Sequence, residues 1–230
     1  MQASPLLEDA DAVGRVLEEI AILVRPLFGQ GIVASYIPEL ARVPPRRFGI
    51  SYRSISGVDC GVGDCDEPFS IQSISKVFSL VLALNRVESV VWSKIGKEPS
   101  GTPFNLIAQL EAEKGIPRNP LINAGALVVT DLLFDAAPDP AQLVLDFARF
   151  LIGSVSPVID DAVATSELAT SYTNMALANV LALHQTVSRP PSAIVECYCR
   201  QCAIAMSCRE LSLWPSFRSR LAASRHGSGR

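Results

Sequence analysis

The chain has 230 residues, of which 49% are hydrophobic and 19% charged, and its formal net charge is −3. This balance is typical of a globular protein with one large core or two small ones, and the mild acidity gives no general reason to expect nucleic acid or an anionic membrane as a partner. No run of about 18 uncharged apolar residues occurs, which argues against a transmembrane helix. The acidic start "MQASPLLEDADAVG" argues against a signal peptide, so we expect a cytoplasmic protein.

Helical patterns dominate the chain, with one hairpin before them. Helical spacing of apolar residues predicts a helix over 9–25, and a shorter helical piece is expected in 31–41, broken by Pro38. Alternation predicts a strand within 46–57, followed by a turn and the start of a second strand in 58–68. Further helices are predicted over 75–90, 123–135, 141–152, 166–183 and 193–206. Without an internal repeat or a clear linker, we expect one compact α+β unit with very few strands.

Six cysteines raise the question of a metal site or a disulfide. Cys60 and Cys65 flank a turn rich in Gly and Asp, and four more cluster late in the chain, at positions 197, 199, 202 and 208. A zinc site needs a second ligand pair at metal spacing, and His184 and His226 are the only histidines. Free cysteine packs as a small hydrophobe. We therefore expect the late cluster to lie in the core, and we expect no metal and no cofactor.

Residues 69–84, "FSIQSISKVFSLVLAL", place Ser73 three residues before Lys76 at the start of an apolar helix. Positions i and i+3 share a helix face, and the positive end of a helix favours a developing oxyanion. Apolar surroundings lower the pKa of a lysine, which makes a neutral amine available as a base for a hydroxyl nucleophile. The alternative is a lysine that reaches solvent from the first turn. Ser-x-x-Lys alone is a weak signal, but only Lys76 among four lysines has a serine at this spacing.

Longer blocks resemble the serine-dependent glutaminase family. After "FSIQSISKVFSLVLAL" come "GKEPSGTPFN", "GIPRNPLINAGAL", "SELATSYTN" and "YCRQCAIAMSCREL", so the resemblance covers about residues 8–211. It implies a β-lactamase/transpeptidase-like α+β fold, mostly helical here with an incomplete antiparallel sheet. It also implies hydrolysis of L-glutamine to L-glutamate and ammonia through a glutamyl-serine intermediate. Family members commonly assemble as homo-oligomers, and the resemblance implies a tetramer.

The resemblance assigns roles to individual residues. Ser73 matches the nucleophile, Lys76 its general base, and Tyr36 a tyrosine that closes the site beside them. Glu167 matches the carboxylate that receives the α-ammonium group of the substrate. Taken singly, these residue types also fit helix ends, solvated first turns or core aromatics. Substrate binding is implied for Ser73, Asn123, Glu167, Asn174 and Tyr198.

The sequence departs from the family pattern after "MSCREL". Family members continue through a Gly-rich stretch, a tyrosine of the catalytic site and a Lys-Ser-Gly-like strand that ends at an oxyanion-hole valine. This chain instead reads "SLWPSFRSRLAASRHGSGR", which resembles the product of a reading-frame change. We therefore expect residues 1–211 to form a glutaminase domain that is incomplete at its C-terminal end, and residues 212–230 to form an aberrant, basic, disordered tail.

Two alternatives to an active glutaminase stay open. Loss of one oxyanion donor typically lowers the rate by about 10²–10³. The chain could therefore be a truncated, inactive homologue that acts as a fragment or as an interaction partner of full-length subunits. A penicillin-recognising serine hydrolase is the second alternative, which the long match to the glutaminase blocks disfavours.

Overall fold

The computed structural model describes residues 8–101 and 103–213. Its helices are α1 (Ala10–Val24), α2 (Ser75–Lys94), α3 (Ile107–Ala112), α4 (Asn123–Leu133), α5 (Pro140–Ile152), α6 (Asp161–Thr170), α7 (Tyr172–Leu183), α8 (Pro191–Cys202) and α9 (Cys208–Ser212). Its strands are β1 (Gly49–Arg53), β2 (Asp59–Gly63), β3 (Phe69–Ser70), β4 (Val158–Ile159) and β5 (Ile204–Met206). Short 3₁₀ turns are η2 (Arg25–Leu27), η3 (Leu40–Arg42) and η4 (Gln72–Ile74).

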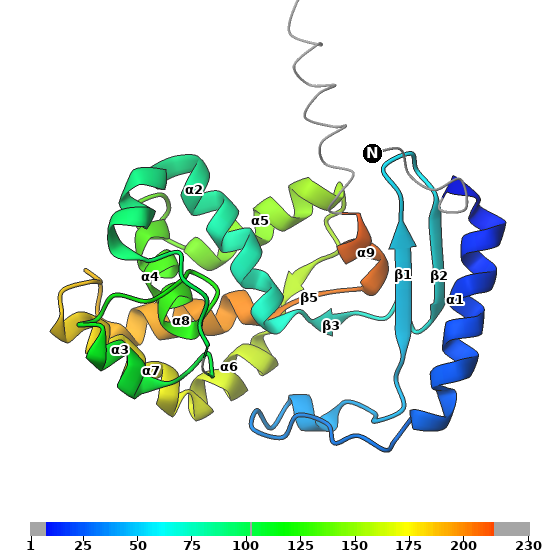
Figure 1. The fold of residues 1–230 in the computed structure, drawn as a ribbon, viewed down its shortest axis with the longest axis horizontal. Coiled ribbons are helices and arrows are strands. Elements are labelled where there is room, and N and C mark those ends of the chain that lie inside the picture. Colours follow the sequence, from blue (N-terminus) through cyan, green and yellow to red (C-terminus); the bar gives the residue numbers. More distant parts are fainter. Residues whose placement is uncertain (1–7, 102, 214–230) are drawn as a thin grey trace, which may run out of the picture.

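The larger part of the molecule is a group of helices around α4 (Figure 1). Residues 124–133 of α4 are all buried, and α2, α7 and α8 pack around this helix. A helix that is apolar on every side belongs in the middle of a core. The central position of α4 matters for the site, because its first residue, Asn123, lies where the surrounding helices converge.

A hairpin and α1 form the second part of the molecule, on the right of Figure 1. Strands β1 and β2 pair antiparallel from Gly49 opposite Gly63 to Arg53 opposite Asp59. Helix α1 packs against them, and the Asp9 carboxylate caps its N-terminus by accepting from the backbone N–H of residues 11 and 12. A separate small sheet has the order β3-β5-β4, with both pairs antiparallel.

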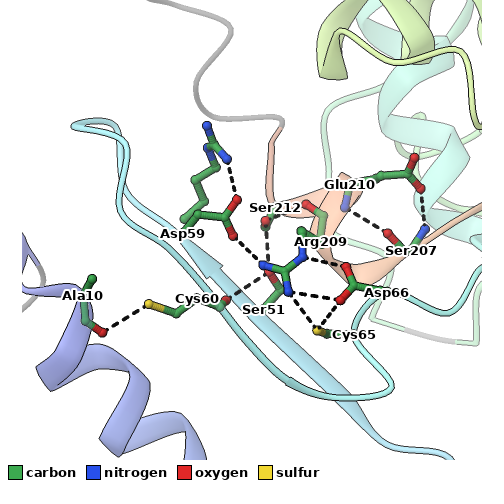
Figure 2. A network of polar contacts seen from close by, with 11 residues as sticks. Ala10, Ser51, Asp59, Cys60, Cys65, Asp66, Ser207, Arg209, Glu210 and Ser212 are labelled. Atoms are coloured by element: carbon green, nitrogen blue, oxygen red, sulfur yellow. Dashed lines mark hydrogen bonds and ion pairs between the residues drawn. The ribbon is translucent and has the colours of Figure 1, made fainter.

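Arg209 of α9 ties the end of the described chain to the hairpin (Figure 2). Its Nη1 lies 2.8 Å from Asp59 Oδ1, its Nε lies 2.6 Å from Asp66 Oδ1, and its backbone N–H donates to the Cys65 carbonyl at 3.0 Å. The hydrogen bond from Arg209 lowers the pKa of the Asp66 carboxyl. Charge-assisted bonds of this kind hold α9 against the hairpin although the two are far apart in sequence.

The fold class is confirmed, since the structure is mostly helical with small antiparallel sheets. The helices predicted over 9–25, 75–90, 123–135 and 141–152 correspond to α1, α2, α4 and α5, and the predicted hairpin is β1 and β2. The strand predicted within 46–57 is shorter, at Gly49–Arg53. The helical piece expected in 31–41 is wrong for all but the short turn η3, because turns around Pro38 replace it.

Two predicted helices have different ends in the structure. Residues 166–183 do not form one helix, because the chain breaks at Ser171 between α6 and α7, where the Ser171 hydroxyl donates to the Glu167 carbonyl at 2.7 Å. The helix predicted over 193–206 stops at Cys202, since residues 204–206 instead pair with β3 and β4. Helices α3 and α9 and strands β3 and β4 were not predicted.

The expected packing of the cysteine cluster is confirmed in α8, where Cys197, Cys199 and Cys202 are free and buried. It is wrong for Cys208, which is only half-buried, because it lies in α9 at the edge of the core. Within residues 8–101 and 103–213, no group of three or more His, Cys, Asp or Glu is placed to hold a metal ion, and none of the helices is long and apolar enough to cross a membrane. The tail was expected over residues 212–230. Its first residue, Ser212, is the last residue of α9, and residues 214–230 lie outside the described residues.

Candidate active site

A strained turn delivers Ser73 to the start of α2. Strand β3 is followed by Ile71, whose backbone N–H donates to the Ile204 carbonyl of β5 at 2.8 Å. Gln72 then adopts a positive φ of 48°, a left-handed conformation that residues other than glycine rarely take. Ser73 lies in η4, immediately before α2, and its side chain is exposed. The turn therefore presents the hydroxyl group at the N-terminal end of α2, whose backbone departs from helical geometry only later, at Val87.

Lys76 lies one turn further along and is buried, with 4% of the residue exposed. Its Nζ donates to the Leu121 carbonyl at 3.1 Å and to Asn123 Oδ1 at 2.7 Å. Burial lowers the pKa of the Lys76 amine, and this effect exceeds the opposing effects of Cys202 and Glu167. A neutral amine has two hydrogens and one lone pair, so these two acceptors can take both hydrogens and leave the lone pair free to accept a proton.

Asn123 connects Lys76 to a second asparagine. Its Oδ1 accepts from the lysine, and its Nδ2 donates to Asn174 Oδ1 at 3.0 Å. With both hydrogens of the neutral Lys76 amine directed to Asn123 Oδ1 and the Leu121 carbonyl, the Asn123 amide presents its oxygen to the lysine and its nitrogen to Asn174. Three helices, α2, α4 and α7, thus contribute one side chain each to a chain of polar contacts.

Glu167 is a buried carboxyl group on α6, with 7% of the residue exposed. Burial raises its pKa to about 7, although hydrogen bonds with Gln72 and Cys202 and the charge of Lys76 act in the opposite direction. Gln72 Nε2 lies 3.2 Å from Glu167 Oε2. Burial therefore outweighs the mutual attraction of Glu167 and Lys76, and each group has its charged form disfavoured.

The two tyrosines have different positions in this region. Tyr198 of α8 is buried, with 2% exposed, and it hydrogen-bonds with Ser73 and Cys202. Burial raises the pKa of Tyr198 well above its ordinary value, so its hydroxyl group is a neutral donor and acceptor. Tyr36 is 70% exposed; partial burial and the charge of Glu167 raise its pKa. Among the described residues, no hydrogen bond joins Tyr36 to Ser73 or Lys76.

The structure brings the residues singled out by sequence into one region, through several separate contacts. Ser73 contacts Tyr198, Lys76 contacts Asn123, and no hydrogen bond joins Ser73 directly to Lys76 within the described part of the chain. Such contacts are often loose without substrate and tighten when it binds. The region offers a serine hydroxyl, a buried amine and a buried carboxyl group, which together suit acyl transfer on a substrate that carries a cation.

Sequence reasoning missed three participants in this region. Gln72 directly precedes the serine and could have been suspected from that position. Cys202 lies four residues after Tyr198, so the two side chains share one face of α8. The Leu121 carbonyl could not have been found, because a backbone acceptor leaves no signal in residue types.

A cleft of about 600 Å³ lies beside this region. Ser70 and Gln72 line it together with residues of the hairpin and of the segment before it, whereas Ser73, Lys76 and Glu167 do not. The ionisable groups with shifted pKa, Lys76 and Glu167, therefore lie outside the lining of this cleft.

Comparison with known proteins is consistent across sequence and structure. The glutaminase family model matches residues 31–221. A glutaminase of Caulobacter vibrioides (strain NA1000 / CB15N) is 56% identical over 197 residues, which is 86% of this chain and 64% of that protein. A glutaminase of Methylobacterium sp. (strain 4-46) is 50% identical, over 86% of this chain and 65% of that protein. The chain thus spans slightly less than two-thirds of the length of these curated relatives.

The fold of the chain is also similar to that of a solved structure. The probable glutaminase ybaS superimposes with a TM-score of 0.82 at 30% identity, covering 94% of this chain and 68% of that one. The family match over residues 31–221 includes every residue of the site described above. The chain belongs to the glutaminase family.

Proposed function

We propose that the chain is a glutaminase, which hydrolyses L-glutamine to L-glutamate and ammonia. The observation that carries this proposal is the buried Lys76 amine, whose two contacts are acceptors and whose pKa is lowered by burial, one helical turn from the exposed Ser73 hydroxyl. A hydroxyl nucleophile needs a base that is neutral near physiological pH. The membership in the glutaminase family supports the choice of a carboxamide as the group attacked.

The proposed reaction has two acyl-transfer steps. Ser73 Oγ attacks the γ-carboxamide carbon while Lys76 Nζ takes the hydroxyl proton, and the lysine then gives that proton to the leaving nitrogen, which departs as ammonia. Water attacks the resulting γ-glutamyl ester, Lys76 accepts its proton, and Ser73 leaves with a proton restored. Tyr198, which hydrogen-bonds with Ser73, would steady the serine oxygen, and Tyr36 would close the site on the exposed side.

Substrate recognition is proposed to depend on the polar groups around Lys76. Glu167 would receive the α-ammonium group, because an ionised carboxylate in a buried position pairs strongly with a cation that replaces its lost water. Asn123 and Asn174, which already hydrogen-bond each other, would bind further polar groups of the substrate. A free amino acid offers the charge and the amide that these groups can satisfy.

The organisation and setting of the protein are also proposals. We take residues 1–211 as the glutaminase domain, and we propose a cytoplasmic homo-oligomer, a tetramer, that acts on free L-glutamine without nucleic acid or membrane as a partner. The family supports the substrate, and the large exposed side chains of α1 and α7, such as Leu23 and Leu183, support association between copies. Sedimentation of the purified chain would measure the oligomeric state.

A panel of substrates tests the proposed activity. The chain should release ammonia and an equal amount of glutamate from L-glutamine, and it should act far more slowly on D-glutamine and L-asparagine, whose α-ammonium or amide group is misplaced. A chromogenic β-lactam should stay intact. Hydrolysis of the β-lactam in preference to L-glutamine would favour the penicillin-recognising alternative. No ammonia above the uncatalysed rate would favour the inactive homologue.

A further inference from the structure

Ser70 is the last residue of β3, three positions before Ser73, and it lies outside the set of residues assigned to the reaction. Its hydroxyl group donates to the Cys202 carbonyl at the end of α8, at 2.9 Å. The same hydroxyl oxygen lies 2.8 Å from Gln72 Nε2. Gln72 Nε2 is in turn 3.2 Å from Glu167 Oε2. One side chain of β3 is thus linked, through one amide, to the buried carboxyl group of α6.

The chemistry of the partners fixes which way this amide points. A serine hydroxyl has one hydrogen, and Ser70 uses it on the Cys202 carbonyl, so towards Gln72 it can only accept. An ionised Glu167 can also only accept. Both neighbours therefore require the amide nitrogen of Gln72, which has two hydrogens and gives one to each. With both N–H groups used, the Gln72 side chain has one orientation that satisfies all its neighbours.

We propose that Ser70 is a positioning residue for Glu167, acting through the Gln72 amide. Without the Ser70 oxygen, one N–H of Gln72 loses its acceptor, and the amide is free to rotate about its terminal bonds. The Glu167 carboxylate then loses a hydrogen-bond donor whose position is already fixed in the folded protein, and ordering the freely rotating amide would cost conformational entropy. That this carboxylate receives the α-ammonium of glutamine rests on the proposed function; the link from Ser70 to Glu167 does not.

A purely structural role for Ser70 would lead to a different experimental result. If Ser70 served only to tie β3 to the end of α8, its removal would lower stability without changing the ionisation of Glu167. The Gln72 hydrogen bond favours the ionised form of Glu167. Loss of that bond should therefore raise the pKa of the carboxyl group, a readout that a change in stability alone does not move.

The ionisation of Glu167 can be measured directly in the ligand-free protein. Carboxyl ¹³C chemical shifts followed against pH give the titration, and the Glu167→Gln variant identifies the signal. The ionisable groups that face Glu167 stay in place in every variant and should be followed with it: Tyr36 before η3, Lys76 on α2, and Tyr198, Cys199 and Cys202 on α8.

Threonine and valine at position 70 form a matched pair, because they share a shape and differ in the hydroxyl group. Ser70→Val should raise the pKa of Glu167 by about half a unit to one unit, and Ser70→Thr should leave it near that of the parent. Ser70→Val should also raise the KM for L-glutamine by about three- to tenfold with little change in kcat, because the substitution weakens substrate binding and leaves the reacting groups unchanged. Ser51→Ala, which removes a half-buried strand serine that donates to a carbonyl elsewhere, should change neither quantity.

A double-variant comparison separates the proposed route from any other. Gln72→Met removes the amide and should raise the pKa of Glu167 as Ser70→Val does, and the two changes together should raise it no more than Gln72→Met alone. The proposal would be overturned if the two substitutions raised the pKa of Glu167 additively, or if Gln72→Met raised that pKa while Ser70→Val did not. It would also be overturned if Ser70→Thr changed the pKa of Glu167 as Ser70→Val does. Because the titration needs no turnover, an inactive chain with the expected pKa pattern would refute the proposed function and leave the positioning role intact.

Discussion

Two buried ionisable residues, Lys76 and Glu167, give the site its character. Each lies in surroundings that disfavour its charge, and burial is the largest cause of both shifts in pKa. A protein optimised for stability alone would place apolar side chains there. Groups of this kind are found where a base must be neutral or where a substrate charge will replace the missing solvent.

Glu167 should therefore destabilise the folded protein at high pH. Its pKa rises from 4.5 to about 7 on folding. Below about 4.5 the carboxyl group is protonated in both states and has no effect. Between about 4.5 and 7 the unfolded chain ionises while the folded chain stays protonated, so that above 7 the folded state has lost about 3 kcal/mol relative to the unfolded chain. We predict that Glu167→Gln raises the free energy of unfolding near pH 8 by up to this amount, and that the gain disappears near pH 4.

Chemical denaturation at several pH values measures this effect, with Glu196→Gln on the exposed face of α8 as the control. The control should change the free energy of unfolding by less than about 0.5 kcal/mol at every pH. The Glu167 variant should at the same time bind L-glutamine more weakly by about 2–4 kcal/mol, since an α-ammonium would lose its partner. A Glu167 variant that is less stable than the parent near pH 8 would contradict the account of this carboxyl group.

Among single residues, the side chains were more predictable than their contacts. Ser73 and Lys76 could be found because only Lys76 among the four lysines has a serine three residues earlier, and because the blocks around them resemble a known family. Gln72 could be suspected from its place before the serine, but its role could not be assigned, because that role depends on a positive φ and on a neighbour 95 positions later in the chain. Contacts between distant elements depend on tertiary packing, which residue types alone do not report.

At the scale of elements, the approach of one loop to α4 sets the position of the lysine. Gly125 lies in the first turn of α4, and a Cβ atom there would lie 2.0 Å from the Asn119 carbonyl oxygen and 2.8 Å from Pro120 Cα. Both atoms belong to the backbone of the loop that leads to Leu121, whose carbonyl accepts from Lys76. Only glycine allows this loop to lie so close to the helix.

We predict that Gly125→Ala displaces this loop and impairs both stability and activity. The clash should lower the free energy of unfolding by about 1–3 kcal/mol. Because the Leu121 carbonyl would move away from Lys76, the apparent pKa of the acidic limb of the rate profile, which reports the proposed Lys76 base, should also change. Thermal unfolding and the pH dependence of kcat measure the two effects.

Gly14→Ala is the matched control for this prediction. Gly14 lies within α1, and a Cβ atom there would meet nothing within 4 Å. Alanine in an open helical position should stabilise the protein by about 0.5–1 kcal/mol. If Gly125→Ala were as stable as Gly14→Ala and equally active, the close approach of the loop would have no role in placing the lysine.

Elements with a strong local pattern were predicted well, and those that depend on distant partners were not. Helix α5 has the aspartate cap at Asp139, a proline in its first turn and Gly153 at its end, and it was predicted to within one residue. Strand β5 was predicted as the end of a helix, because "AIAM" is as suitable for a helix as for a strand. It is a strand because β3 and β4 pair with it on both sides.

At the scale of the whole molecule, the site lies where the helical part meets the small β3-β5-β4 sheet. Strand β3 carries the chain from the hairpin into the turn before Ser73, and β5 follows directly from α8, which carries Tyr198 and Cys202 (Figure 1). The Arg209 contacts hold the segment after β5 against the hairpin. The position of the serine therefore depends on both parts of the molecule.

The central claim is that Ser73 is the nucleophile of a glutamine-hydrolysing site. The most direct measurement is glutamate release from L-glutamine by the 230-residue chain and by its Ser73→Ala variant, with Ser93→Ala, which alters an exposed serine at the far end of α2, as the control. The account predicts that the parent and the Ser93 variant release glutamate at the same rate and that the Ser73 variant retains less than about one-thousandth of it while still binding L-glutamine. Glutamate release by Ser73→Ala at the rate of the parent, or none by the parent, would contradict it.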